Sequence, residues 1–227
     1  MGFQIAIDGP SGSGKSTVAR RLAKRLGFVY VDTGAMYRAV GLYCDTAGIE
    51  VNDETAVSGV LGEMDIKIEY SNEAQLIFLN GDDVTAAVRT PRAAVAAAAV
   101  AAHGAVRVKL VEIQRKLAKE ADVVMDGRDI CDYVLPEANV KVYLNASVEA
   151  RVTRRCNELE QLGVKFDYEQ IKKQIIERDV FDSNRKIAPL AVSKDAVEID
   201  ASELDVEGVV EAILVVARDR GFRKAEG

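Results

Sequence analysis

The chain has 227 residues, of which 48% are hydrophobic and 29% are charged. This composition excludes a mainly disordered chain, which would be poorer in apolar residues and more strongly charged. The net charge of −6 argues against a general nucleic-acid binder, which would carry a basic face. The length fits one large domain, or one domain that carries inserts.

The sequence has no signal for a membrane or for export. No window approaches the run of about 18 apolar residues that marks a membrane span, and the N-terminus lacks the basic and apolar regions of a signal peptide. Cys44, Cys131 and Cys156 have no C-x-x-C spacing, so we expect buried thiols rather than a disulfide or zinc site. We therefore expect a cytoplasmic protein, in which the lone His103 is structural.

The first part of the chain alternates strands with helices. Short apolar runs at 3–8 and 28–31 predict buried strands, and apolar residues at helical spacing predict helices over 15–26 and 36–47. The order strand–helix–strand–helix is typical of a parallel α/β sheet.

The pattern then changes to short antiparallel elements. Asn52 is expected to cap a short helix that runs to Met64. Two segments that alternate with period two, each followed by a turn, predict hairpins: strand 66–70, turn 71–74, strand 75–79 and turn 80–81. Hairpins do not belong inside a parallel sheet, so we interpret residues 59–90 as a small antiparallel insert.

The remainder of the chain returns to helices and core strands. A helix is expected from Thr90-Pro91, and its run of Ala and Val over 93–102 predicts close packing. Gly104 interrupts it, and a second helix runs to about residue 119. Further strands are expected at 123–126, 140–144 and 196–200. Ser147 is expected to cap a helix that runs to residue 162, and Asp167 opens another, with Gln170 three residues on as in a capping box. An amphipathic helix is expected over 205–220.

The segment Gly9–Ser16 matches the phosphate-loop pattern G-x-x-x-x-G-K-[ST]. Its glycines let successive backbone N–H groups point into one concavity, and the following helix adds its positive end. Lys15 can reach the terminal phosphates, and the Ser16 hydroxyl can hold Mg²⁺. The pattern predicts a site for a nucleoside triphosphate with Mg²⁺. The residues expected to contact it are Gly9, Pro10, Ser11, Gly12, Ser13, Gly14, Lys15, Ser16 and Thr17.

A phosphate loop does not by itself distinguish a kinase from a GTPase switch or a motor ATPase. The GTPase interpretation needs an N-K-x-D motif, which the sequence lacks. A motor ATPase usually places Glu after the acidic end of its core strand, to activate water. Here Gly127 follows Asp126, which suits an enzyme that passes the phosphoryl group to an acceptor other than water.

Arginines gather in three polar segments of this acidic chain. Asp32–Arg38 follows the second predicted strand, Asp126–Asp129 follows the third, and Arg178–Arg185 lies late in the sequence. In an open parallel sheet, ligands bind beyond the carboxyl ends of the strands. We therefore expect the first two segments to lie near the phosphate loop, where they would bind an anion.

Four segments together resemble bacterial cytidylate kinases: IAIDGPSGSGKSTVAR, VDTGAMYRAV, VMDGRDI and ERDVFDSNRKIAPL. The resemblance spans nearly the whole chain. It implies an α/β, three-layer P-loop NTPase fold with a five-stranded parallel sheet, a small antiparallel NMP-binding insert and a helical lid. It implies a core at 1–58, 91–154 and 186–227, with the insert at 59–90 and the lid at 155–185.

The resemblance also implies the reaction and its partners. ATP with Mg²⁺ and CMP or dCMP would give ADP and CDP or dCDP. We expect no nucleic-acid or membrane partner, and we expect a monomer. No covalent nucleophile or general base is required, because the acceptor phosphate is already an anion. Catalysis would consist of in-line positioning and charge neutralisation.

The resemblance implies roles for individual residues outside the phosphate loop. Arg38, Arg128 and Arg185 would hold the acceptor phosphate, with Thr33 nearby. Arg178 and Asp182 would lie around the ribose, Arg154 would reach the donor phosphates, and Arg107 and Asp129 would read cytosine. The catalytic set would be Lys15, Arg128, Arg178 and Arg185. Arg151 and Arg155 are weaker candidates, because arginines on a helix surface are common.

The assignment of cytosine to Arg107 and Asp129 agrees with the chemistry of the base. A carboxylate matches the N4 amine, and a guanidinium matches the N3 and O2 acceptors. Uracil would set O4 against the carboxylate and N3–H against the guanidinium, so the pair also disfavours uracil.

The sequence departs from the family pattern at two places. The family usually continues D-G-R-D-I with Gly-Thr, where this chain has Cys131-Asp132. It also tends to carry Ser in the helix before Arg107, where this chain has Ala98. Both departures concern affinity for the base and leave the reaction class unchanged.

Two alternatives remain open from the residues. One is another small-molecule P-loop kinase, for example one acting on shikimate or on a different monophosphate, which the Arg107 and Asp129 pair disfavours. The other is a non-enzymatic nucleotide switch. A kinase would consume ATP rapidly only when the right monophosphate is present, whereas a switch needs no acceptor.

Overall fold

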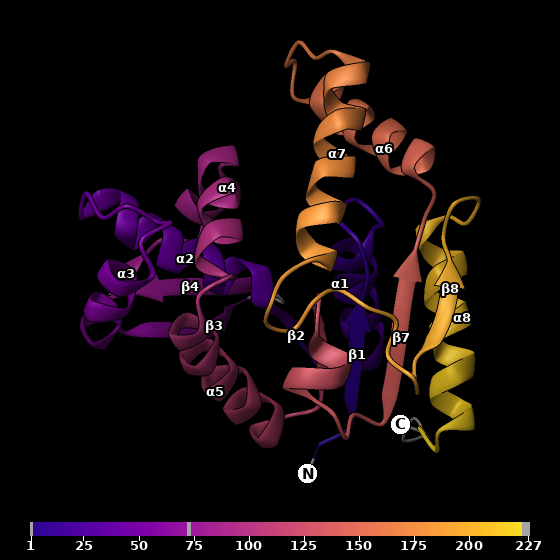
Figure 1. Cartoon of the computed structure of the whole chain (residues 1–227). Helices are drawn as coiled ribbons and strands as arrows, with labels where there is room; N and C mark the ends of the chain where they lie inside the picture. Colours follow the sequence, from indigo (N-terminus) through magenta and orange to yellow (C-terminus); the bar gives the residue numbers. More distant parts are fainter. Residues whose placement is uncertain (1, 72–73, 224–227) are drawn as a thin grey trace. The chain divides into compact units, whose positions relative to one another are not determined.

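A computed structural model describes residues 2–71 and 74–223 of the chain (Figure 1). It contains a five-stranded parallel sheet with the strand order β2-β6-β1-β7-β8 and a three-stranded antiparallel sheet with the order β3-β4-β5. Contacts divide the chain into two compact units. The first unit is residue 2 with Val29–Asp122, and the second unit is Phe3–Phe28 with Val123–Gly227.

The second unit is built on four strands, β1 (Gln4–Asp8), β6 (Val123–Gly127), β7 (Val140–Asn145) and β8 (Val197–Asp200). Strand β1 pairs in parallel with both β6 and β7, and β1 and β6 are buried along their whole length. In this register Asp8 lies opposite Gly127, so the carboxyl ends of β1 and β6 meet at one edge. The apolar character of both strands follows from burial on both faces.

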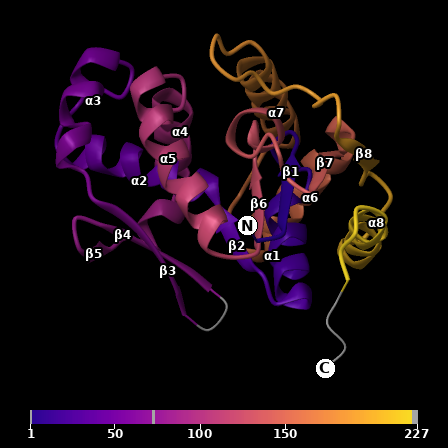
Figure 2. The same cartoon turned by 90° about the horizontal axis from the view of Figure 1, so that it is seen from below.

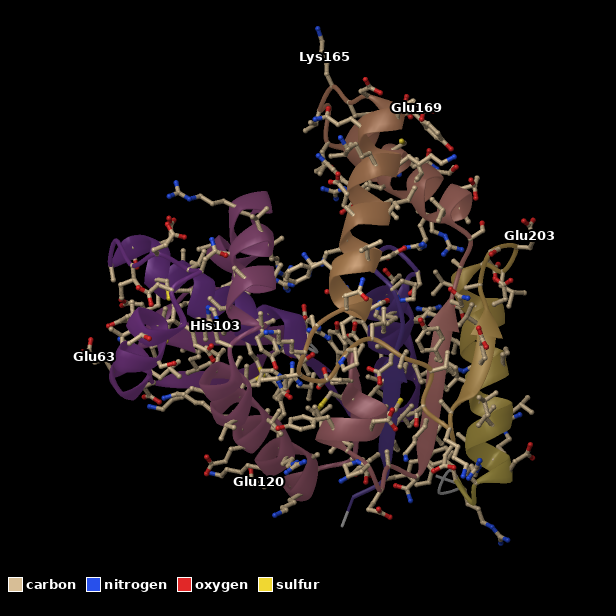
Figure 3. All side chains as sticks on the ribbon, in the orientation of Figure 1. Glu63, His103, Glu120, Lys165, Glu169 and Glu203 are labelled. Carbon is tan, nitrogen blue, oxygen red and sulfur yellow. The ribbon has the colours of Figure 1, made fainter. Side chains whose placement is uncertain are left out.

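The helices of the second unit are α1 (Lys15–Leu26), α6 (Val148–Gln161), α7 (Tyr168–Ser183) and α8 (Val206–Asp219), with a π-helix, η3, over Ile130–Val134. Helices α6 and α7 pack side by side through Val152, Cys156, Ile171 and Ile175 (Figure 1). Lys165 projects from the tip of the turn that joins them (Figure 3).

The first unit begins with β2 (Val29–Asp32) and α2 (Thr33–Thr46), followed by α3 (Glu54–Val60) and the 3₁₀ turn η1 (Leu61–Glu63). The antiparallel strands follow: β3 (Ile66–Ser71), β4 (Ala74–Leu79) and β5 (Asp82–Asp83). The 3₁₀ turn η2 (Ala87–Arg89), α4 (Pro91–Val100) and α5 (Gly104–Glu120) complete the unit.

Helix α2 lies against both α4 and β4 in the first unit (Figure 2). The approach of α2 to α4 is close, because a Cβ placed on Gly41 would be 2.7 Å from the Cβ of Ala96. The predicted close packing of the Ala and Val run is therefore confirmed. Core residues that α2 and α5 supply include Met36, Val40 and Leu110, all fully buried.

The structure confirms the predicted α/β fold class and corrects several local expectations. Asp53, rather than Asn52, caps α3 by accepting the Ala56 N–H, and α3 itself ends at Val60. Asn and Asp are equally good caps, so the sequence did not distinguish the two neighbours. Helix α2 begins at Thr33 instead of residue 36, because Asp32 caps it.

Other expectations were incomplete or fall outside the described residues. Strand β5 and helix η3 were not expected, and both are short elements without a periodic signal. The expected turn at 71–74 includes residues 72–73, which lie outside the described part of the chain. The predicted insert, 59–90, falls within the first unit, and the predicted lid, 155–185, falls within the second. Both boundaries stay predictions.

Among the described residues, no single helix is long and apolar enough to cross a membrane. One bent pair of helices, Arg92–Val100 with Gly104–Glu120, meets that test jointly, by length and composition only.

Candidate functional site

The phosphate loop joins β1 to α1 in the second unit, and its glycines are required by geometry. Gly12 and Gly14 have φ angles of 77° and 95°, in the left-handed region that favours glycine. A Cβ on Gly9 would be only 2.1 Å from the carbonyl oxygen of Leu144. The loop therefore needs glycine at each of these positions. It ends at the N-terminus of α1, where the backbone N–H groups of the helix stabilise a bound anion.

Lys15 is 5% exposed and is held by the loop itself. Its Nζ donates to the carbonyl of Pro10 at 2.6 Å and to Ser13 Oγ at 3.4 Å. Burial lowers the pKa of this ammonium well below its usual range, and the positive charge of Arg128 lowers it further. The carboxylates of Asp126, Asp8 and Asp182 raise this pKa in part, and a polyphosphate bound in the loop would add further negative charge beside the lysine.

Ser16 and Asp126 form a pair of oxygen groups beside the loop. The Ser16 hydroxyl donates to Asp126 Oδ2 at 2.8 Å, which connects the first turn of α1 to the end of β6. Hydroxyl and carboxylate oxygens are the ligands that Mg²⁺ prefers, so this pair fits that ion. No group of three or more His, Cys, Asp or Glu that could hold a metal occurs in the part of the chain that the structure describes.

Asp8 anchors the backbone that follows the predicted base-binding residue Asp129. It is 2% exposed, and its two oxygens accept the N–H groups of Ile130 at 2.9 Å and Cys131 at 2.8 Å. Burial raises the pKa of this carboxyl to about 6, although the two N–H groups act in the opposite direction. One buried carboxylate thus fixes the segment that starts at the end of β6.

Asp182 accepts hydrogen bonds from two of the predicted ligand arginines of the second unit, Arg128 and Arg178. It is 2% exposed and its Oδ2 accepts from Arg128 Nε at 2.9 Å and from Arg178 Nε at 3.3 Å. Burial alone would raise the pKa of Asp182, but Arg128 and Arg178 lower it below its ordinary value, and Arg185 adds to this effect. Asp182 thus holds both arginines through their Nε atoms, and Arg128 Nη1 also donates to the Gly127 carbonyl at 3.2 Å.

Two further predicted arginines of the second unit, Arg185 and Arg154, donate hydrogen bonds to backbone carbonyls. Arg185 donates to the carbonyl of Ala188 at 2.9 Å. Arg154 donates to the carbonyl of Ser13 at 3.1 Å and to that of Ala201. Thr17 is exposed in the first turn of α1. Arg154 therefore contacts the backbone of the phosphate loop, and its role at the donor phosphates stays a prediction.

The first unit holds Arg38 at the start of α2. Arg38 Nη2 donates to Asp32 Oδ2 at 2.9 Å, while Asp32 Oδ1 caps the helix by accepting the Ala35 N–H. The side chain of Gln75, which is buried on β4, pairs with the backbone of Asp32 in both directions. It accepts the Asp32 N–H at 2.7 Å and donates to the Asp32 carbonyl at 3.3 Å.

Two more predicted residues lie in the first unit. Arg107 is 1% exposed on α5, and its Nη1 donates to the Tyr37 hydroxyl at 3.5 Å. Thr33 is buried at the first position of α2. The structure therefore groups Arg128, Arg178 and Asp182 in one cluster, and it places Arg38 and Arg107 in the other unit.

Several residues of these arrangements were absent from the predicted site. Asp126 was noted only as the acidic end of a strand, and Asp8, which ends β1 in the same way, was not singled out. Acidic residues at the carboxyl ends of parallel strands are a usable signal for both. Gln75 gives no such signal, because its partner Asp32 is 43 residues away in the sequence.

Comparison with known proteins identifies similar chains over nearly the whole length of this one. The family model described as Cytidylate kinase matches residues 5–219. A cytidylate kinase of Shouchella clausii is 46% identical over 218 residues, which cover 96% of this chain and 97% of the relative. One of Geobacillus kaustophilus is 47% identical, with the same coverage of both chains.

Likeness to solved structures concerns the fold alone. An uncharacterized protein from Eubacterium ventriosum has a TM-score of 0.53 and 14% sequence identity, over 95% of this chain and 98% of that one. The family model and the two relatives extend over almost the full length and confirm the predicted family. The chain belongs to the cytidylate kinase family.

Proposed function

We propose that this protein transfers the γ-phosphoryl group of ATP to CMP and dCMP, giving ADP and CDP or dCDP. Membership of the cytidylate kinase family supports this activity. The observation that carries it is the cluster around Asp182, in which a buried carboxylate orients two arginines, one of which also lowers the pKa of Lys15. A chain of net charge −6 has concentrated cations beside its phosphate loop.

The phosphates would be held by the groups already described. Lys15 and the N-terminus of α1 would bind the donor phosphates, with Arg154 contributing from α6. Arg128, Arg178 and Arg185 would neutralise the charge that develops during transfer, and Arg38 would hold the acceptor phosphate together with them. Such preorganised charges stabilise the transition state because they require no reorientation during the reaction.

Mg²⁺ would be held by the Ser16 hydroxyl, with the Asp126 carboxylate beside it. When bound, the ion would neutralise charge on the donor phosphates. The residue after Asp126 is Gly127, so this strand end places no carboxylate there to activate water. That arrangement favours transfer to an acceptor over hydrolysis, and it makes a nucleotide switch the less favoured alternative.

Specificity for cytosine would come from Arg107 and Asp129. The Asp129 carboxylate would accept from N4, and the Arg107 guanidinium would donate to N3 and O2. Thr33 and Asp182 would complete the contacts to the monophosphate, near its phosphate and its ribose. We also propose that the protein acts as a monomer in the cytoplasm.

A coupled ADP-release assay with CMP, dCMP, UMP, AMP and shikimate as acceptors tests this proposal. We expect rapid ADP release with CMP and dCMP, much slower release with UMP, and only a background rate without acceptor. Rapid release with shikimate or AMP alone would assign the chain to another kinase reaction. A rate that does not change when any acceptor is added would contradict the kinase assignment.

A further inference from the structure

Arg151 lies at the meeting point of three segments of the second unit. It stands in the first turn of α6 and is 4% exposed. Its Nε donates to the carbonyl of Ala146 at 3.1 Å, at the junction of β7 and α6. Its Nη1 donates to the carbonyl of Ser11 at 3.1 Å, within the phosphate loop. This is not the solvated helix arginine that the sequence suggested.

The third segment is helix α7, which supplies the counter-ion. Arg151 Nη1 and Nη2 donate to the two oxygens of Asp179 at 2.9 and 2.6 Å, so the ion pair is bidentate. A bidentate pair fixes the plane of the guanidinium as well as its position. The same plane also addresses the Ser11 carbonyl, so α7 and the phosphate loop share one rigid group.

The loop itself leaves little room for an alternative arrangement. A Cβ on Gly12 would be 3.3 Å from the Cβ of Arg151, so the arginine packs directly against the loop backbone. Arg154, one turn further along α6, donates to the carbonyl of Ser13. Two loop carbonyls are therefore held from one face of α6. A peptide unit whose carbonyl is fixed has its N–H orientation restricted as well, because the unit is planar.

We propose that Arg151 is a positioning residue that fixes the phosphate loop for polyphosphate binding, with Asp179 of α7 as the partner that fixes Arg151. This inference rests on the proposed function for its kinetic consequences, because the donor substrate is the ligand of the loop. Lysine cannot replace Arg151, because one ammonium cannot present a planar fork to the Ser11 carbonyl and both Asp179 oxygens.

The test uses Arg151→Lys and Asp179→Asn in the full chain. Binding of Mg·ADP and of inorganic tripolyphosphate, which has neither base nor sugar, is measured by calorimetry without CMP. In Arg151→Lys we expect both dissociation constants to rise about 10- to 100-fold, because a misplacement of about 1 Å has effects of that size. The KM for ATP should rise with them, while the KM for CMP should change less than about twofold.

Asp179→Asn should weaken both probes in the same direction and by a smaller factor, because the Ser11 contact is retained. Asparagine has the same side-chain shape as aspartate, so this variant still tests the proposal if Arg151→Lys does not fold. Arg155→Lys is the matched control, since Arg155 lies on the same helix, is 41% exposed in its side chain and pairs with Glu158, three residues later on the same helix. It should bind both probes as the wild type does.

A folded Arg151→Lys variant with wild-type dissociation constants would overturn the proposal, even if its melting temperature fell. Weaker ADP binding with unchanged tripolyphosphate binding would also overturn it, because the effect would then not pass through the phosphate loop. If the wild type fails to phosphorylate CMP, the proposed function is lost, but the two probes still decide the role of Arg151.

Discussion

The two units anchor their arginine-bearing segments by similar geometry but with different chemistry. In the first unit the amide of Gln75 holds the backbone of Asp32, six residues before Arg38. In the second unit the carboxylate of Asp8 holds the backbone of Ile130 and Cys131, which directly follow the D-G-R-D segment. Each anchor makes two hydrogen bonds to main-chain groups, and each is buried.

The difference lies in ionisation. An amide is neutral at every pH, whereas burial raises the pKa of Asp8 to about 6. The first anchor should therefore be insensitive to pH, and the second should weaken the folded state once it ionises. A carboxylate offers one acceptor oxygen to each of two N–H groups, whereas a side-chain amide has one acceptor oxygen and one NH₂ donor group. We infer that the second unit tolerates an ionisable anchor because its backbone presents two donors side by side.

The largest effect should follow from removing the phosphate-loop cation of the second unit. Lys15→Ala should lower kcat by about 10²–10³, since one charge-stabilising group contributes that much in rate. The fold should be kept, because the hydrogen bonds from Lys15 to Pro10 and Ser13 lie within its own loop. Lys24→Ala, on the exposed side of the same helix, is the control for kcat measured with ATP and CMP. A Lys15→Ala variant with more than half of wild-type activity would remove the phosphate loop from the mechanism.

The ionisable anchor should appear in the pH dependence of stability. The pKa of Asp8 is about 6 in the folded chain, against an ordinary value of 3.8, so the folded state binds the proton more tightly. Its contribution to stability is therefore full below about pH 4, decreases as the pH rises through about 6, and changes by about 3 kcal/mol in total. Urea unfolding of the wild type and of Asp8→Asn between pH 4 and pH 8 measures the difference.

The difference in free energy of unfolding between the wild type and Asp8→Asn should become smaller as the pH rises to about 6, and should then stay constant. Gln75→Glu supplies the reciprocal test in the first unit, because it places a buried carboxyl where an amide stands. That variant should acquire a new loss of stability with rising pH, of the same sign. A difference that does not vary with pH would show that Asp8 is ionised at its ordinary pKa in the folded chain.

A smaller effect is expected from the base-binding residue of the second unit, Asp129. Asp129→Asn should reduce activity with CMP and narrow the preference for CMP over UMP, because an amide can rotate to donate to uracil O4. The change in discrimination should be about 1–3 kcal/mol, as for a bidentate base contact. The measurement is the ratio of kcat/KM for CMP to that for UMP. An unchanged ratio would show that Asp129 does not read the base.

Much of this architecture could be predicted from sequence, whereas the contacts of Arg151 and Gln75 could not, because their partners are distant in the sequence. The phosphate loop and the core strands are local patterns, and the structure places β1, α1 and β6 within a residue or two of the expected bounds. Lys15 and Ser16 were predicted as ligands from the same local pattern, and the structure places both at the start of α1. Arg151 was underestimated because its partners, Ser11 and Asp179, are 140 and 28 residues away.

Asp182 and Gln75 differ in how far the sequence could predict them. Asp182 was expected through the motif that contains it, and the structure adds that it pairs with Arg178 one turn earlier and with Arg128, 54 residues away. Gln75 belongs to no motif, and a single Gln on a strand is ordinary. Long-range partners of buried polar groups follow from the packing of whole elements, which neither periodicity nor spacing encodes.

The smallest expected effect concerns Ala98 of α4, in the first unit, where the family tends to carry Ser. Ala98 is half-buried, on a helix that packs closely against α2. If this position lies beside the base, as the resemblance implies, Ala98→Ser restores a hydrogen bond worth about 0.5–1.5 kcal/mol. The KM for CMP should then fall about 2- to 10-fold with little change in kcat, because the contact acts equally in the ground and transition states. The competing interpretation is packing alone: α2 approaches α4 closely at Gly41 and Ala96, and a buried serine hydroxyl without a partner would cost stability. Melting temperature and KM, measured on the same preparation, separate the two. A lower melting temperature with an unchanged KM would assign Ala98 to the contact between α2 and α4, because a hydroxyl that reaches cytosine must change the affinity for CMP.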